Sequence, residues 1–330
     1  MATTDARPNV TELRGLACLL LVAYHTVGVP GAGMHVGDDS VYRYLTSSFE
    51  LIRMPLFTFI SGYVYAARPA RAGALGVFFG KKMRRLLLPF VIVSTLFYLL
   101  QTAVSGANGT DAPEAMWRIY LFSYAHLWYL QALFLIFAVV AVADSFGLMD
   151  RPRGFAGAFA LALAAFYAID TRANVLSVNE AATLLPHFLL GVAVRRFAGA
   201  FAGPRAALLA PLALAAGLAV HQASLLHLVD YQIGWKSGVA LLCGMGGALT
   251  LFRAMPTSAV LRTIGGASYA IYLYHTFFTA AARIALGRLG YDADLLVFGL
   301  SLAAGITGPM LVEAVALMRP WTRVALVGRA

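Results

Sequence analysis

The chain has 330 residues, of which 60% are hydrophobic and only 12% are charged. A soluble domain of this size carries about 25% charged residues, so the composition excludes a soluble globular enzyme, a disordered chain and a coiled coil. A transmembrane helix needs roughly 20 apolar residues, and about ten such helices would take up most of the chain. The composition therefore predicts an all-α polytopic membrane protein, with one membrane-embedded domain over residues 1–330.

Basic residues outnumber acidic ones, and the formal net charge is +10. In a soluble protein this charge would suggest a nucleic-acid partner, but in a membrane protein it points first to the excess of Lys and Arg in cytoplasmic loops. We therefore expect membrane lipids and no nucleic acid as partners. Cys18 and Cys243 both lie in apolar runs and indicate no disulfide framework. The first apolar run lacks a basic n-region and a cleavage site, which favours a retained helix over a signal peptide.

Ten apolar segments follow one another along the chain, with boundary errors of about two to four residues. When the N-terminus is placed in the cytoplasm, 18 of the 25 Lys and Arg residues fall inside and seven outside. This asymmetry predicts about ten transmembrane helices with both termini in the cytoplasm. The segments cover approximately residues 13–31, 49–67, 86–104, 126–146, 154–170, 181–198, 205–221, 235–252, 259–282 and 294–318.

The first segment carries two ionisable residues, Arg14 and His25. They are eleven residues apart, which places them on one helix face about 16 Å apart along the axis. Arg14 then lies at the cytoplasmic end and His25 lies deep in the membrane. A lone histidine in a helix is often a satisfied core residue, but ionisable residues inside a membrane are expensive and are functional candidates.

The second segment opens with Glu50 and Arg53, which share a helix face. Because this helix runs inward from the outer surface, Arg53 should lie at a depth similar to that of His25. The two residues either neutralise each other locally or form the polar wall of a cavity that also contains His25. Further along, Ser61 and Gly62 are typical of a close helix approach.

Residues 72–85 predict a basic amphipathic helix at the cytoplasmic interface, with Phe78, Phe79 and Met83 facing lipid. It either anchors the protein to the membrane or forms a basic mouth for a phosphate-bearing ligand. The cations that would face the headgroups or the ligand are Lys81, Lys82, Arg84 and Arg85.

Other polar residues inside the predicted helices are less informative when each is taken alone. His126 and Trp128 begin the fourth segment, as is ordinary at a membrane interface. Tyr272 and His275 share one face of the ninth segment. No cysteine and histidine spacing typical of a metal site is present, nor is a known hydrolase or nucleotide-binding motif. We therefore expect no metal.

Taken together, five motifs make the sequence resemble the acyltransferase-3 family of integral membrane O-acyltransferases. The stretch from Glu12 to His25 is similar to the family's Arg-x10-His signature, and the similarity extends over about residues 10–318. Four further motifs follow in the family's order: MPLFTFISGY at 54–63, KKMRRLLLPF at 81–90, HLWYL at 126–130 and SYAIYLYH at 268–275.

The resemblance implies transfer of an acyl group, often acetyl, from cytoplasmic acyl-CoA to a hydroxyl of an extracytoplasmic glycan such as an exopolysaccharide or O-antigen. It implies a bacterial inner membrane location, acyl-CoA as a donor substrate and no permanently bound cofactor. Arg14 and His25 match the family's arginine and histidine. Some members carry a fused periplasmic domain, for which we expect no room here. The acceptor, the acyl chain length and the oligomeric state are not readable from the sequence.

This chemistry fits the residues already described. Arg14 and the cations of the basic mouth would hold the CoA phosphates. His25 would act either as a general base or as a nucleophile that forms an acyl-histidine. Arg53, or a Tyr or Ser hydroxyl, would stabilise the oxyanion, and Glu50 with Arg53 would line an outer acceptor cavity. The candidate substrate-binding residues are His126, Trp128, Tyr272 and His275. Alternative functions are a glycan or lipid transporter and a non-catalytic subunit of a polysaccharide export complex.

Overall fold

The computed structural model describes residues 9–29, 33–103 and 115–329. Every regular element within these residues is a helix, and an isolated bridge joins Phe122 to Val175. The all-α prediction is confirmed for this part of the chain. The ends of the first and third predicted segments, at 30–31 and 104, lie outside the described residues, as does Arg7.

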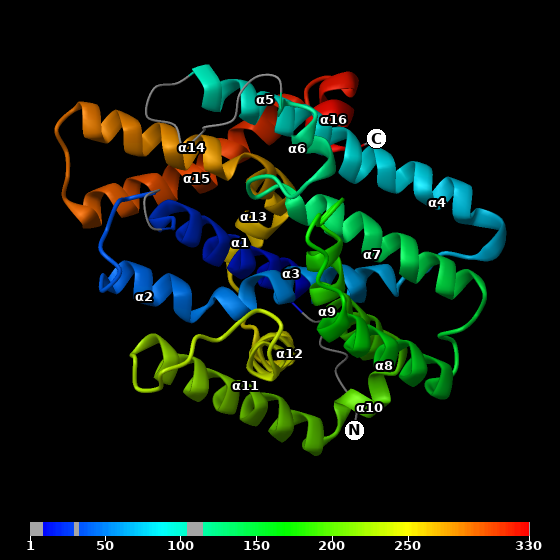
Figure 1. The fold of residues 1–330 in the computed structure, drawn as a ribbon. Coiled ribbons are helices and arrows are strands. Elements are labelled where there is room, and N and C mark those ends of the chain that lie inside the picture. The colour runs from blue at the N-terminus through cyan, green and yellow to red at the C-terminus, as the bar shows by residue number, and fades with distance from the viewer. Residues whose placement is uncertain (1–8, 30–32, 104–114, 330) are drawn as a thin grey trace.

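Long helices follow the predicted apolar segments in order (Figure 1). The ninth segment is the exception, because it breaks at Ala267 into a short helix and a long one. The long helices are α1 (Val10–Val27), α3 (Glu50–Tyr65), α5 (Leu88–Ala103), α7 (Trp128–Ser145), α8 (Pro152–Ala168), α9 (Val178–Arg196), α11 (Pro204–Leu225), α12 (Gly238–Ala254), α14 (Ser268–Arg288) and α15 (Asp294–Ala316).

Shorter helices connect or flank the long ones. Residues 72–103 form a continuous helical run of 32 residues, in which a 3₁₀ turn, α4 and a π-helical turn lead directly into α5. The short helices are α2 (Val41–Ser48), η1 (Ala72–Ala74), α4 (Leu75–Lys82), η2 (Met83–Leu87), α6 (Arg118–Leu121), α10 (Ala198–Ala202), α13 (Ala259–Gly266) and α16 (Pro320–Val327).

Five helical stretches in the described residues are long and apolar enough to cross a membrane. They correspond to α1, the run at 72–103, α7, α11 and α15. Helices α9 and α14 are also long, but polar residues inside them lower their hydropathy, and α3 has only 16 residues. The chain is thus an all-helical membrane protein, whereas the count of ten spans and the side of each terminus stay predictions.

The basic helix at 72–85 differs from the amphipathic pattern expected of it. Phe78 packs against Tyr65 and Phe137, and Phe79 lies 6.5 Å from Phe134 between ring centroids. The expectation that Phe78 faces lipid is therefore wrong, because α7 presents an aromatic face to α4, whereas Phe79 is half-exposed. Met83 is exposed, as expected for a lipid-facing side chain.

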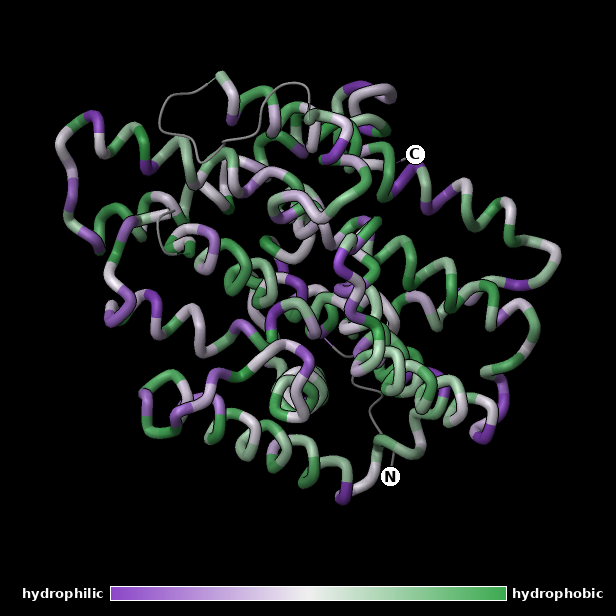
Figure 2. Tube along the Cα trace, viewed as in Figure 1, coloured by the Kyte–Doolittle hydropathy of each residue, from purple (hydrophilic) through white to green (hydrophobic). Residues whose placement is uncertain are grey.

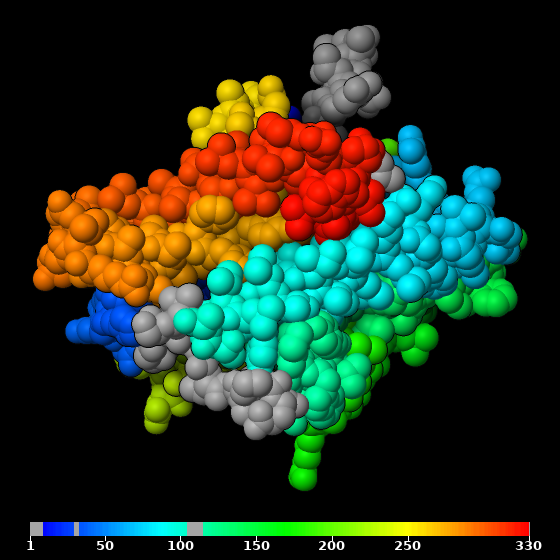
Figure 3. All heavy atoms as spheres, turned by 90° about the horizontal axis from the view of Figure 1, so that it is seen from above, coloured from blue at the N-terminus to red at the C-terminus, as the bar shows by residue number. Residues whose placement is uncertain are grey.

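Helix α1 lies at the centre of the bundle in Figure 1, in contact with α3, α13, α14 and α15. Figure 3 shows α16 lying across α5 and α15 on the face seen from above, in agreement with their contacts. In Figure 2 the helices are mostly green along their lengths, and purple recurs in the loops between them. Many large apolar side chains are exposed on the outer helices, as expected where the surrounding solvent is lipid.

Two helix pairs cross at glycine, where backbones touch. A Cβ on Gly265 of α13 would lie 1.8 Å from the carbonyl oxygen of Thr11, and one on Gly15 would lie 2.0 Å from that of Leu261. Gly62 of α3 stands in the same relation to Phe188 of α9, at 2.0 Å, which confirms the close approach predicted there. In lipid there is little hydrophobic driving force between helices. The close packing that small residues allow at such crossings stabilises helix association instead.

Ion pairs reinforce these crossings at one end of the bundle. Glu12 of α1 is buried and accepts hydrogen bonds from Nε and Nη2 of Arg262 of α13, at 2.9 and 2.8 Å. Asp144 of α7 accepts two hydrogen bonds from Arg196 of α9 and a third from the Tyr65 hydroxyl of α3. Each buried carboxylate accepts at least two hydrogen bonds from an arginine, which offsets part of its desolvation cost and links the helices that carry the pair.

The α1–α13 crossing is tested by adding a side chain to it. Gly265→Val should destabilise the protein by about 1–3 kcal/mol or more, because the added atoms overlap the Thr11 carbonyl and force the helices apart. Gly266→Val is the matched control, since a Cβ at Gly266 meets no described atom within 4 Å. Thermal unfolding of the purified proteins in detergent measures both, and equal melting temperatures would contradict the packing argument.

The predicted topology is tested by labelling single exposed cysteines with a membrane-impermeant maleimide. Cys18 and Cys243 are buried and should stay unlabelled. Only cysteines on the outer side should react in intact cells, and a labelled inner position would show that a predicted span is absent. Cysteines for the inner side replace Arg71, Arg151 and Arg205, and those for the outer side replace Arg172, Asp230 and Tyr291.

Candidate active site

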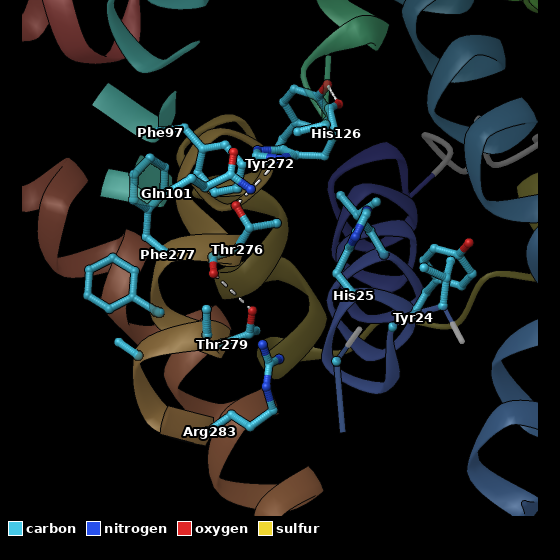
Figure 4. Close-up of a pocket in the computed structure, with 18 of the residues that line it drawn as sticks. Tyr24, His25, Phe97, Gln101, His126, Tyr272, Thr276, Phe277, Thr279 and Arg283 are labelled. Carbon is cyan, nitrogen blue, oxygen red and sulfur yellow. Dashed lines mark hydrogen bonds between the residues drawn. The ribbon is translucent and has the colours of Figure 1, made fainter. Parts of the chain in front are cut away.

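A pocket of about 820 Å³ lies among the ends of α1, α3, α5 and α14. The turn before α7, the loop before α12 and the segment after α1 also line it. Figure 4 shows how the labelled side chains surround it. Much of this wall is aromatic, and its polar side chains come from distant parts of the sequence. The aromatic and polar lining residues are Tyr24, His25, Arg53, Phe97, Gln101, His126, Trp128, Trp235, Tyr272, Thr276, Phe277, Phe278, Thr279 and Arg283.

Three histidines from three segments lie close together at the wall of this pocket. The ring of His275, in α14, lies 4.9 Å from the ring of His25 and 4.8 Å from that of His126, between centroids. The His25 and His126 rings are 6.0 Å apart. The first, fourth and ninth predicted segments are therefore joined at one point, which none of their spacings alone indicated.

Hydrogen bonds to backbone carbonyls fix two of these rings. His275 donates from Nδ1 to the carbonyls of Ile271 and Tyr272, at 2.8 and 3.0 Å. His126 donates from Nε2 to the Leu273 carbonyl at 3.1 Å. Because a carbonyl oxygen only accepts, these contacts assign the ring protons, and a neutral ring keeps its lone pair on the other nitrogen.

The remaining lone pairs of these two rings differ in their surroundings. Nδ1 of His126 lies 3.4 Å from the Thr276 hydroxyl, which can donate to it. Nε2 of His275 is buried and has no hydrogen-bond partner within the described residues. The Tyr272 hydroxyl donates to the His126 carbonyl and so holds the turn before α7 against α14. The site therefore contains one rigid, unsatisfied acceptor beside His25.

His25 is the least constrained member of the cluster. It lies near the C-terminal end of α1, lines the pocket, is half-buried and makes no hydrogen bond with the described residues. Figure 4 shows its ring projecting from α1 toward the side chains of α14. An imidazole in this position is free to bind a proton from a group that enters the pocket.

Arg53 lines the same pocket as His25, whereas their depth in the membrane stays a prediction. Its guanidinium carbon lies 3.3 Å from the centroid of the Tyr24 ring, and its Nε and Nη1 have no partner in the described part of the chain. Glu50 does not line the pocket and forms no ion pair with Arg53 within 4 Å. Glu50 is therefore not part of the polar wall expected of it, although its charge still interacts with that of Arg53 one turn along α3.

The structure brings the four candidate substrate-binding residues together. His126, Trp128 and Tyr272 line the pocket, and His275 lies directly behind its wall. Sequence reasoning missed Thr276, Thr279 and Arg283, although their i, i+3 and i+7 spacing is that of one helix face. It also missed the contributions of α5 and of the loop before α12, for which no sequence signal exists.

The basic residues at the opposite end of α1 form two groups. Lys81 and Arg84 are exposed, whereas Lys82 and Arg85 turn inward. Lys82 Nζ lies 3.4 Å from the centroid of Phe137, and the Arg85 guanidinium lies 4.6 Å from that of Tyr269. This alternation separates two half-buried cations, Lys82 and Arg85, from two exposed ones, Lys81 and Arg84.

Arg14 belongs with the inward group. It is half-buried, and Arg85 is its charged neighbour. Close by, Arg329 forms an ion pair with Glu313 at 2.6 Å. Arg85 also lies within reach of Glu313, whereas no acid is a charged neighbour of Arg14 or Lys82 among the described residues, so this end carries excess positive charge that suits a polyanion.

Packed side chains separate this cationic end from the pocket. Cys18 and Leu21 lie between Arg14 and His25 on α1, and both are buried. Cys18 is within 3.8 Å of the Ser268 carbonyl, at the start of α14. A ligand that extends from Arg14 to His25 must displace these contacts.

The sequence model of the acyltransferase domain family, acyltransferase-3, matches residues 9–314. The chain belongs to this family. Searches of curated proteins and of solved structures gave no match. The family match and the fold together make this chain a membrane acyltransferase, which favours catalysis over the transporter and export-subunit alternatives. No group of three metal-ligating side chains occurs in the residues that the structure describes.

Proposed function

We propose that this acyltransferase moves an acetyl group from cytoplasmic acetyl-CoA to a hydroxyl of an extracytoplasmic glycan, in the inner membrane of a bacterium. The observation that carries the proposal is the position of His25. It lines a pocket at one end of α1, and the inward cations lie with Arg14 at the other end. Donor and acceptor would approach His25 from opposite sides, with no permanently bound cofactor.

His25 serves as the general base in this proposal. Its free nitrogen takes the proton of the acceptor hydroxyl while the hydroxyl oxygen attacks the thioester carbonyl carbon. The bond between that carbon and sulfur then breaks, and the departing CoA thiolate takes the proton from the imidazolium. The unpartnered Nε and Nη1 atoms of Arg53 are donors suited to the oxyanion that forms between these steps.

His275 orients the base. An imidazole accepts a proton at one nitrogen most effectively when its other nitrogen donates to a fixed acceptor. The buried Nε2 of His275 is such an acceptor, and its ring is fixed by two carbonyls. Rotation of the His25 ring toward His275 would complete the pair, as catalytic hydrogen bonds often tighten only when substrate is bound.

The inward cations hold the donor. Arg14, Lys82 and Arg85 would bind the CoA phosphates, and Lys81 and Arg84 would contact lipid headgroups. From Arg14 the pantetheine arm would extend about 16 Å along α1 to His25. This path requires that Cys18 and Leu21 move away from their packing partners when the donor binds.

The first test concerns His25. His25→Ala should abolish acetyl transfer, because the hydroxyl then has no base, and positioned proton transfer contributes about 10²–10⁴-fold. His25→Gln keeps a polar side chain of similar size but cannot take the proton, so its loss of rate should be nearly as large. Transfer is measured by mass spectrometry of surface glycans from a deletion strain complemented with each variant.

His227→Ala is the matched control, since this histidine lies in the loop after α11, away from the pocket lining. It should retain wild-type acetylation. Glycan acetylation at the wild-type level by either His25 variant, at equal protein abundance, would remove His25 from the mechanism.

The second test separates the two groups of cations. Arg85→Ala and Arg14→Ala should weaken binding of acetyl-CoA by about tenfold or more, since a charge-assisted hydrogen bond contributes about 1.5–3 kcal/mol. Arg84→Ala is the matched control and should change affinity little, because exposed ionic contacts contribute under about 1 kcal/mol. Equilibrium binding of radiolabelled acetyl-CoA in neutral detergent measures the effect without anionic lipid.

Salt gives a further readout in the same assay. Wild-type affinity should fall as ionic strength rises, because phosphate contacts at the mouth are screened. If Arg84→Ala weakens binding as much as Arg85→Ala does, the inward and outward groups are equivalent and the donor site is wrongly placed.

A further inference from the structure

The lining residues of the pocket that the structure describes include two guanidinium groups and no carboxylate. Arg53 and Arg283 line it together with His25 and His126, and no Asp or Glu is among its lining residues in the described chain. A pocket enclosed mostly by aromatic and aliphatic side chains screens charge poorly. The wall therefore presents two fixed positive charges to whatever occupies it.

The two arginines differ in their partners. Arg53 stacks on Tyr24, with Glu50 one turn earlier on its own helix. Arg283 is half-buried near the C-terminal end of α14, and none of the ion pairs in the described residues includes it. A partly desolvated arginine with no counter-charge among the described residues is costly, which marks Arg283 as a candidate for binding an anionic group that enters the pocket.

Helix geometry directs Arg283 into the pocket. Thr276 and Arg283 are seven residues apart, so they share a helix face at a separation of about 10.5 Å along the axis. Helical side chains lean toward the N-terminus of their helix. Figure 4 shows this directly, with the guanidinium of Arg283 aimed along the pocket toward Thr279. Thr276, at the far end of this face, contacts His126 in the histidine cluster.

We propose that Arg283 is a specificity residue that binds a carboxylate or phosphate oxyanion of the acceptor, so that the natural acceptor is an anionic glycan. This inference rests on the proposed function, since it assigns the acceptor class of the same pocket. The guanidinium fork pairs with two oxygens of such a group and fixes its orientation.

The geometry also limits how far the anionic group of the acceptor lies from the hydroxyl that is acylated. The hydroxyl to be acylated must lie beside His25, whereas the anion lies toward Arg283, up to two helix turns away along α14. The charged group is therefore on the far side of the acylated sugar or on the sugar next to it. Trp128 and Trp235 line the same pocket and offer aromatic faces to sugar rings between the two points.

The experiment measures binding of small probes by tryptophan fluorescence, because Trp128 and Trp235 line the pocket. Methyl β-D-glucuronide, glucose 6-phosphate and the neutral methyl β-D-glucoside are titrated into the full-length protein in neutral detergent. Wild type should bind an anionic probe about tenfold or more tightly than the neutral one, as expected for a charge-assisted contact. Arg283→Gln should lose this preference and keep its affinity for the neutral probe.

Arg288→Gln is the matched control, since it removes the same charge from the same helix at an exposed position outside the pocket lining. It should keep the wild-type preference. Equal binding of charged and neutral probes by wild type, or an unchanged preference in Arg283→Gln, would overturn the proposal. Loss of the preference in Arg288→Gln would also overturn it, because the effect would then be that of net charge.

A lipid phosphate is the other source of an oxyanion at this depth. The titration is therefore repeated in nanodiscs of zwitterionic lipid with and without phosphatidylglycerol. If phosphatidylglycerol lowers the affinity of wild type for the charged probe but not that of Arg283→Gln, Arg283 binds headgroups and the acceptor assignment is wrong. If phosphatidylglycerol leaves the affinity of wild type for the charged probe unchanged, the acceptor assignment is supported.

Donor binding separates this inference from the proposed function. Arg283→Gln should bind acetyl-CoA as wild type does, since Arg283 and Arg14 lie toward opposite ends of the bundle. If wild type binds the charged probes selectively but does not bind acetyl-CoA, the proposed anion site is supported and the proposed donor is wrong. If wild type binds acetyl-CoA without preferring charged probes, the proposed donor is supported and the proposed anionic acceptor is wrong.

Discussion

The structure depends on the close backbone contact between α1 and α13 at Gly15 and Gly265. In lipid, apolar surface alone provides little reason for helices to associate, so direct contact and paired polar groups must hold α1 in the centre of the bundle. The ion pair of Glu12 with Arg262 lies at the same crossing. Both features sit near Arg14, and because a helix is rigid they also fix the far end, where His25 meets the pocket.

The histidine cluster shows how the fold turns three ordinary residues into a reactive group. One nitrogen of His275 and one of His126 donate hydrogen bonds to backbone carbonyls, so neither ring can turn freely. His25 lacks such a bond and faces the pocket. Under the proposed function this asymmetry would give positioning to His275 and proton transfer to His25, although both are the same residue type.

The sequence predicted the helical segments well, because long apolar runs give a strong signal. It also indicated that His25 and Arg53 line one cavity, and it indicated the close approach at Gly62. It failed where the outcome depends on which helices are neighbours. Phe78 was expected in lipid because its own helix is amphipathic, but the aromatic face of α7 lies beside it. Arg283 gave no separate signal, since an arginine at a helix end is ordinary until a pocket without carboxylates is seen around it.

The buried contacts between Arg14 and His25 bear on a problem that every transmembrane acyl transfer shares. A thioester exposed to water in the pocket would be hydrolysed without acylating the acceptor. With Cys18 and Leu21 buried, the cationic end and the pocket are separated by packed side chains. Under the proposed function the donor arm would itself open and fill the passage, so that no continuous aqueous path need exist. Water exclusion would then come from the substrate, and the strength of the phosphate contacts at the mouth would set how far the passage opens.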